Sequence, residues 1–285
     1  MKHLLFTLLF AILCIGDISA QEDKVAKMLK NYPENYAGTT NIMYINSKES
    51  DVTYKIHIYL PITNYQSQKQ YPLMILTDGF YAMDLARASF NLLTTNRIIP
   101  EVIVAGIDYP YSNMDQLNRH RFRDMFATRV EGYNPSGKSD QFIAFMEKEL
   151  IPLMEYNYRV DSNDRCYVGH SAGGILGSQI LMEKPDLFNR YIIGSPAYWW
   201  DNKEIIKRLT ERDEIGCKKN TIVYTYVGEK EGDIMLKPWK EFNALLKTRI
   251  NDRIKLYEQI YKDENHVTVI PTAFMRSVMA VYKDE

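Results

Sequence analysis

Cysteine is scarce in this chain, which has three in 285 residues. Scaffolds that depend on disulfides carry far more cysteine for their length, so this fold must be stabilised by its hydrophobic core. We expect Cys166 and Cys217 to be buried thiols rather than a bridge. The third, Cys14, lies near the N-terminus after the bulky Leu13. Lipid attachment sites normally have a small residue there, so lipidation at Cys14 is only a minor alternative.

An excess of charge of one sign is also missing. The chain has 35 Lys and Arg against 36 Asp and Glu, a formal net charge of −1. Such a chain has no general electrostatic attraction for nucleic acid or for an anionic membrane. It has no H-E-x-x-H or C-x-x-C motif, and its five histidines are widely spaced. We therefore expect no nucleic-acid partner, no metal and no cofactor.

The N-terminal apolar run is too short to span a bilayer. It covers residues 4–16, follows Lys2, and is succeeded by Ile18-Ser19-Ala20, which puts a small residue at the expected cleavage point. Thirteen residues fall short of the roughly 20 that a transmembrane helix needs, and this arrangement is typical of a secretory signal peptide. We expect residues 1–20 to be removed, leaving 21–285 as one exported domain, periplasmic or secreted, without stable membrane insertion.

The pattern of apolar residues changes along the chain. Between Gly38 and Leu60 apolar and polar residues alternate on both sides of a polar cluster, which predicts an antiparallel hairpin. Short apolar runs then alternate with amphipathic segments, which predicts βαβ units. The expected strands are 72–76, 102–107, 166–169, 191–193, 221–227 and 254–260; the expected helices are 83–95, 139–156, one after Ser171, 203–211, 237–247 and one from Pro271. The fold class is therefore α/β, with a mostly parallel, doubly wound sheet in a single domain.

The segment 169–173, Gly-His-Ser-Ala-Gly, lies between an expected strand and an expected helix. This is the context of a G-x-S-x-G nucleophile elbow, where the turn is so tight that only glycine fits two residues before and after the serine. The motif predicts that Ser171 is a nucleophile. The side chain of His170 is expected to point away from that of the serine.

A serine hydroxyl is a weak nucleophile and needs a base, most often histidine. His266 is the only histidine after Ser171, and the order in this kind of site is serine, acid, histidine. The loop after strand 221–227 offers three carboxylates for the acid. We rank Glu231 first, Asp233 second and Glu229 third, and all three stay open.

An acyl-transfer site also needs hydrogen-bond donors for the oxyanion. The backbone N–H of Ala172, directly after the nucleophile, is one expected donor. The second is expected from the loop after strand 72–76, at the N–H of Phe80 or its neighbour.

Three further side chains are candidates for contact with a substrate. Trp199 and Trp200 follow strand 191–193, at the edge where ligands gather in such sheets. Either one ring stacks on an aromatic acyl group, or both pack in the core. The polar segment 110–138 shows no clear periodicity, which predicts a long irregular loop. Of its arginines we select Arg121.

Together these residues resemble the esterase family of α/β-hydrolases, which includes the siderophore trilactone esterases, the feruloyl esterases and the esterase D type. The segments that carry the resemblance are 76–79, 121–124, 142–152, 169–174, 195–200 and 228–231. The resemblance implies the α/β-hydrolase fold and a serine esterase acting through an acyl-enzyme. It implies Ser171 as nucleophile, His266 as base and Glu231 as acid, with Arg121 and the tryptophan pair beside the substrate.

The expected partner is thus a small-molecule ester, with an aromatic acid as one acyl group to consider. Two alternatives keep the same fold. One is an acyltransferase that passes the acyl group to another hydroxyl, and the other is a non-catalytic binding protein.

Overall fold

The computed structural model describes residues 41–61 and 69–283. The expected signal peptide, Cys14 and the first residues of the expected hairpin lie outside these ranges. Within them, no helix combines the length and the apolarity that crossing a bilayer requires.

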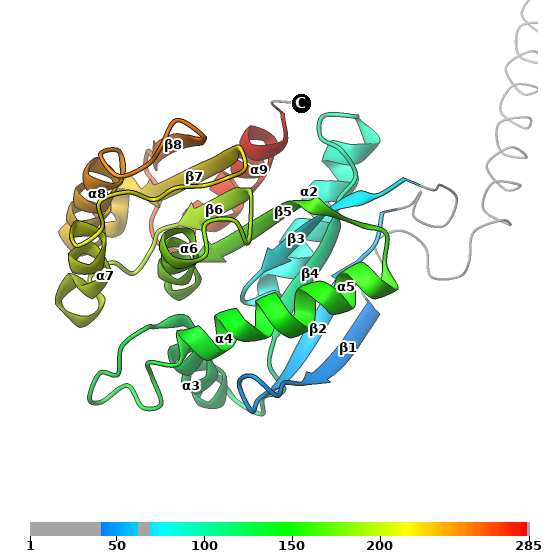
Figure 1. Cartoon of the computed structure of the whole chain (residues 1–285), viewed down its shortest axis with the longest axis horizontal. Helices are drawn as coiled ribbons and strands as arrows, with labels where there is room; N and C mark the ends of the chain where they lie inside the picture. The colour runs from blue at the N-terminus through cyan, green and yellow to red at the C-terminus, as the bar shows by residue number, and fades with distance from the viewer. Residues whose placement is uncertain (1–40, 62–68, 284–285) are drawn as a thin grey trace, which may run out of the picture. The chain divides into compact units, whose positions relative to one another are not determined.

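One eight-stranded sheet organises the described chain (Figure 1). Its strands are β1 (Asn41–Asn46), β2 (Thr53–Tyr59), β3 (Tyr71–Leu76), β4 (Ile103–Asp108), β5 (Val160–His170), β6 (Arg190–Gly194), β7 (Thr221–Gly228) and β8 (Ile254–Tyr261). They lie in the order β1-β2-β4-β3-β5-β6-β7-β8. The hairpin β1–β2 and the pair β2–β4 are antiparallel, and all other pairs are parallel. The expected leading hairpin and parallel sheet are confirmed.

Helices cover both faces of this sheet. They are α2 (Gly79–Thr95), α3 (Met114–Met125), α4 (Ser139–Phe145), α5 (Ile151–Asn157), α6 (Ala172–Glu183), α7 (Trp200–Thr210), α8 (Asp233–Leu246) and α9 (Val269–Tyr282). A π-helical turn, η2 (Met146–Leu150), joins α4 to α5, and a 3₁₀ turn, η3 (Glu229–Glu231), follows β7. Helices α2 and α9 pack on one face in one apolar cluster, and α3 to α8 pack on the other face in a second.

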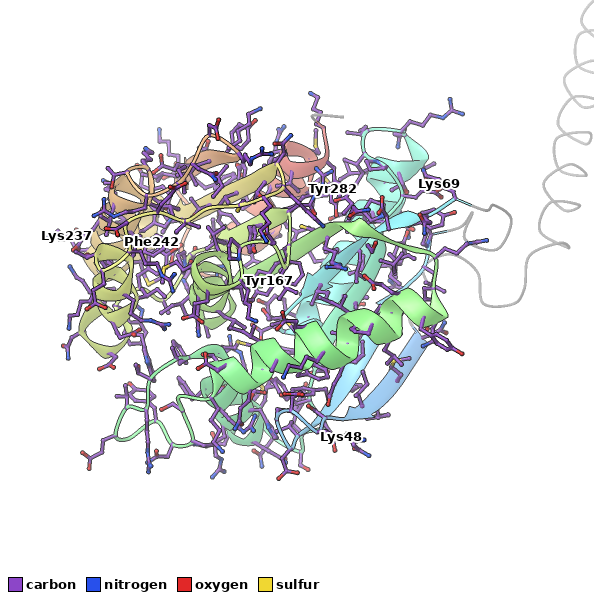
Figure 2. All side chains as sticks on the ribbon, in the orientation of Figure 1. Lys48, Lys69, Tyr167, Lys237, Phe242 and Tyr282 are labelled. Carbon is purple, nitrogen blue, oxygen red and sulfur yellow. The ribbon has the colours of Figure 1, made fainter. Side chains whose placement is uncertain are left out.

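Strands β3 and β4 are almost entirely apolar because both of their faces are covered. Every residue of β3 and β4 is buried. In Figure 2 the side chain of Tyr167 on β5 lies inside the molecule, whereas Lys48 and Lys237 lie at its periphery. Cys166 and Cys217 are both free and buried, as the composition predicts.

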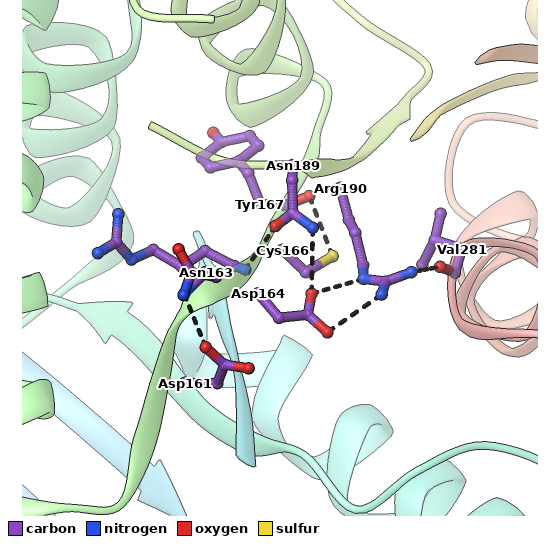
Figure 3. Close-up of polar contacts among 9 residues, drawn as sticks. Asp161, Asn163, Asp164, Cys166, Tyr167, Asn189, Arg190 and Val281 are labelled. Atoms are coloured by element: carbon purple, nitrogen blue, oxygen red, sulfur yellow. Dashed lines mark hydrogen bonds and ion pairs between the residues drawn. The ribbon is translucent and has the colours of Figure 1, made fainter. Parts of the chain in front are cut away.

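One partly buried ion pair ties the sheet to its last helix (Figure 3). The Arg190 guanidinium donates two hydrogen bonds, of 2.6 and 3.0 Å, to the Asp164 carboxylate. The same guanidinium donates to the carbonyl oxygen of Val281 in α9. The contact joins the C-terminal end of α9 to β6.

The expectation of an irregular loop over 110–138 is wrong for α3. Asn113 caps this helix, because its side-chain oxygen accepts a 2.9 Å hydrogen bond from the N–H of Gln116. The helix is mostly polar, so an apolar stripe does not mark it. Its inner face holds charge instead, since Asp124 is fully buried and accepts a hydrogen bond from the Tyr54 hydroxyl at 3.0 Å.

Candidate active site

Ser171 occupies a strained turn between β5 and α6. Its backbone has φ 58° and ψ −110°, which a residue with a side chain rarely adopts. A Cβ atom on Gly169 would lie 2.2 Å from the carbonyl oxygen of Gly173, and one on Gly173 would lie 2.2 Å from Thr77 Oγ1. Both glycines are therefore required for the turn, which holds the serine side chain at the end of β5.

Ser171 and His266 line the same cavity, which has a volume of about 580 Å³. Its polar part also includes Arg121 and His170. The remaining lining residues are largely apolar and come from α2, from the loop before α9 and from the first turn of α9: Phe80, Tyr81, Leu85, Val267, Ile270 and Pro271. A serine and a histidine thus face one largely apolar space that a small ester can enter.

Glu231 is the acid that the structure places against His266. The Nδ1–H of His266 donates to Oε2 of Glu231 at 2.6 Å. The Glu231 side chain is completely buried, whereas that of His266 is 40% exposed. The two alternatives have other partners: Asp233 pairs with Lys237, and Glu229 accepts from the N–H of Asp263.

The second oxygen of Glu231 is also occupied. Its Oε1 accepts a hydrogen bond of 2.6 Å from the Ser195 hydroxyl and another of 2.6 Å from the N–H of Gly228. Burial alone would raise the pKa of Glu231, but the hydrogen bonds from His266, Ser195 and Gly228 outweigh it and lower the pKa. The carboxylate is therefore ionised and fixed in orientation at neutral pH.

Two helices begin beside the cavity that Ser171 lines. Helix α6 starts at Ala172 and helix α2 at Gly79, and neither first turn has a side-chain cap. Phe80, in the first turn of α2, lines the cavity. Uncapped helix N-termini attract negative charge, because their N–H groups lack partners and the helix dipole adds to the field. Both expected oxyanion donors thus lie in elements suited to that role.

Arg121 lines the cavity, but its charge is already paired. Its Nε and Nη2 donate to the two oxygens of Asp78 at 2.7 and 3.0 Å. Burial would lower the pKa of Arg121, and the adjacent Asp78 carboxylate more than compensates and raises it. Asp78 is the left-handed residue before α2, so the pair connects α3 to the start of α2.

The tryptophan pair divides between core and surface. Trp200 is 2% exposed, and its ring stacks on that of Phe126 with the ring centroids 3.8 Å apart. Its Nε1–H donates to Thr128 Oγ1. Trp199 is 38% exposed. Neither ring is among the described residues that line the cavity.

Two residues at the site have contacts that the sequence reasoning missed. His170 lines the cavity, and its Nε2–H donates to the carbonyl oxygen of His266 at 3.0 Å. Burial, assisted by the neighbouring His266, lowers the pKa of His170 to about 3, so its ring is neutral. Ser195 is the other, through its contact with Glu231. No local sequence signal marks either contact, because both join distant segments.

Two features bear on ligands other than an ester: the metal-binding residue types and one phosphate-loop pattern. In 41–61 and 69–283, no three His, Cys, Asp or Glu side chains gather as a metal would need. Residues 132–139 match the phosphate-loop pattern G-x-x-x-x-G-K-S. Helix α3 precedes them rather than a strand, and the Ser139 hydroxyl is bound to Gln179 Oε1 at 2.7 Å. This segment therefore lacks the structural context of a phosphate loop.

Residues 47–270 match a family model described as "Putative esterase". The chain belongs to this esterase family. With its eight-stranded sheet it has the α/β-hydrolase fold, and it is a carboxylic ester hydrolase of the serine type.

Individual relatives agree with the family. The ferri-bacillibactin esterase BesA of Bacillus subtilis (strain 168) is 28% identical over 266 residues, which cover 84% of this chain and 88% of BesA. The siderophore enterobactin esterase of Emericella nidulans is 26% identical over 171 residues, 50% of this chain and 56% of that protein. Among solved structures, the BES protein of Bacillus cereus superposes with a TM-score of 0.75 at 24% identity, covering 88% of this chain and 96% of that one. At this identity the structural likeness shows the fold alone.

Proposed function

We propose that this esterase works through a Ser171–His266–Glu231 triad. The observation that carries the proposal is the 2.6 Å hydrogen bond from His266 Nδ1 to the buried Glu231, beside a cavity that Ser171 shares with His266. With Nδ1 protonated, Nε2 of His266 has a free lone pair and can accept the proton of the Ser171 hydroxyl.

The reaction then follows in two balanced halves. Ser171 Oγ attacks the ester carbonyl while His266 takes its proton, and the N–H groups of Ala172 and Phe80 stabilise the oxyanion. When the intermediate collapses, the imidazolium returns the proton to the leaving alcohol and an acyl-enzyme remains. A water molecule, deprotonated by His266, repeats the attack, releases the acid and restores the serine.

We further propose that the substrate is a siderophore-type ester of an aromatic acid. BesA and the Emericella enzyme are described as siderophore esterases. The cavity is compatible with this class, because the residues that line it are largely apolar. The charge of Arg121, which also lines it, is neutralised by Asp78. We also infer export of the chain to the periplasm or the medium, based on the N-terminal leader pattern.

The triad is tested with Ser171→Ala in the purified protein, assayed on p-nitrophenyl acetate. We expect activity to fall by about 10⁴ or more, because a lost nucleophile removes the whole covalent pathway. Labelling by a fluorophosphonate probe should disappear with it. Ser178→Ala is the matched control, since this buried serine lies in the helix that follows Ser171 and its hydroxyl bonds to the Gly174 carbonyl oxygen and the Tyr198 hydroxyl. Full activity of Ser171→Ala would contradict the triad.

The substrate is tested in the wild-type protein with catecholate trilactones, feruloyl-sugar esters and short acetyl esters. We expect the highest kcat/KM on the trilactones. A preference for the feruloyl or acetyl esters would contradict the siderophore class but leave the triad intact. Adding competing alcohols to the same assay would reveal acyl transfer as a new ester product.

A further inference from the structure

Ser195 is held rigidly at the end of β6. It is completely buried, and its N–H donates to the carbonyl oxygen of Tyr226 on β7 at 2.7 Å. Its backbone has φ 37°, which is strained for a residue with a side chain. A strained conformation persists only where the surroundings impose it, so the position of this hydroxyl is fixed before any substrate arrives.

That hydroxyl contacts the carboxylate of the proposed triad acid. Ser195 Oγ donates to Glu231 Oε1 at 2.6 Å, and the N–H of Gly228 donates to the same oxygen at 2.6 Å. Oε2 is thereby left for Nδ1 of His266. A glutamate side chain has three rotatable bonds, so its carboxylate would sample several orientations without such contacts.

Only one of the two donors to Glu231 Oε1 can be removed by a side-chain substitution. The Gly228 N–H belongs to the backbone and survives side-chain substitution. The Ser195 hydroxyl comes from a neighbouring strand and is the one side-chain group besides His266 that the described contacts place on the carboxylate.

We propose that Ser195 is a positioning residue for catalysis, which orients Glu231 so that His266 is held in the tautomer and direction needed to deprotonate Ser171. This inference rests on the proposed triad. It assigns to Ser195 an effect on the rate of the chemical step, not on substrate binding.

The experiment removes the hydroxyl in two ways in the full chain. Ser195→Ala keeps the strained backbone, and Ser195→Gly relieves the strain. We expect both to lower kcat on p-nitrophenyl acetate about tenfold or more, with KM changed less than about twofold. Ser277→Ala, which removes an equally buried hydroxyl bound to the Phe274 carbonyl oxygen in α9, should retain kcat.

A double-mutant cycle separates positioning from general structural damage. In a Glu231→Gln background, Ser195→Ala should lower kcat by less than about twofold, because the carboxylate it orients is already gone. The same tenfold loss in both backgrounds would overturn the proposal. So would wild-type kcat in Ser195→Ala, or a loss in Ser195→Ala that Ser195→Gly restores. In any of these cases, an inactive Ser171→Ala would still support Ser171 as the nucleophile, so the failure would concern Ser195 and not the proposed esterase chemistry.

Discussion

At the scale of single residues, the proposed mechanism requires His170 to stay neutral beside His266, which would become charged. The ring centroids of His170 and His266 lie 4.6 Å apart. The His170 ring also contacts the His266 backbone, because its Nε2–H donates to the carbonyl oxygen of His266. A charged His170 would repel the imidazolium that the proposed mechanism forms on His266. Burial prevents this, because it lowers the pKa of His170 to about 3.

Replacing His170 by phenylalanine, in His170→Phe, should make the free energy of unfolding less dependent on pH. In the unfolded chain a histidine binds a proton below about pH 6.5, whereas folded His170 does so only near pH 3. The wild type therefore loses stability as the pH falls from 6.5 towards 3. Between pH 7 and pH 5 the free energy of unfolding should fall less in the variant than in the wild type, by up to about 1.4 kcal/mol per pH unit. Urea unfolding of both proteins at the two pH values measures the difference. Equal losses in both proteins would show that His170 is not the responsible group.

At the scale of elements, the start of α2 is set by its contact with β4. A Cβ atom on Gly79 would lie 2.9 Å from both the carbonyl carbon and the carbonyl oxygen of Gly106. Next to this glycine, the Asp78–Arg121 pair holds the first turn from the side of α3. The N–H of Phe80 therefore has a fixed direction, which an oxyanion donor requires because it must be aimed before charge develops.

Gly79→Ala should change the direction of the Phe80 N–H. The added methyl group meets backbone atoms that cannot move aside, so α2 must shift, and we expect kcat to fall by roughly 10- to 100-fold. Steady-state kinetics on p-nitrophenyl acetate would measure it, with the circular dichroism spectrum confirming the fold. Gly216→Ala is the matched control, because the nearest atoms there are 3.8 Å away. Unchanged kcat in Gly79→Ala would argue against a donor at Phe80.

At the scale of the whole molecule, the strand order assembles the site. Strands β5, β6, β7 and β8 are parallel neighbours in chain order, so their carboxyl ends lie along one edge. Ser171, Ser195, Glu231 and His266 each follow one of these four strands in turn. Residues separated by 95 positions in sequence thus meet in one cavity. The sheet that brings them together is stabilised by its apolar core, since both described cysteines are free.

Thermal unfolding should therefore be insensitive to reductant. Burial raises the pKa of both Cys166 and Cys217, so their reactive thiolate forms are suppressed even in an oxidising compartment. We expect the same Tm with and without dithiothreitol in differential scanning calorimetry of the oxidised, purified protein. A Tm that falls on reduction would reveal a disulfide and contradict a fold stabilised by the core alone.

The sequence by itself determined the features that are encoded locally. The elbow at 169–173 is contiguous, and its glycines are needed for a turn of a few residues. The alternation of apolar strands and amphipathic helices likewise reports burial at each position, so the α/β class and most element positions could be predicted. Helix α3 was missed because its inner face is charged, with Asp124 buried against Tyr54.

The tertiary structure alone decided which side chains meet. Three carboxylates follow β7 within five residues, and only the 3₁₀ turn directs Glu231 rather than Glu229 or Asp233 towards His266. The burial of Trp200 likewise depends on rings from the segment 110–138. Such contacts join segments far apart in the chain, and their geometry follows from the twist and order of the sheet, which no local pattern records.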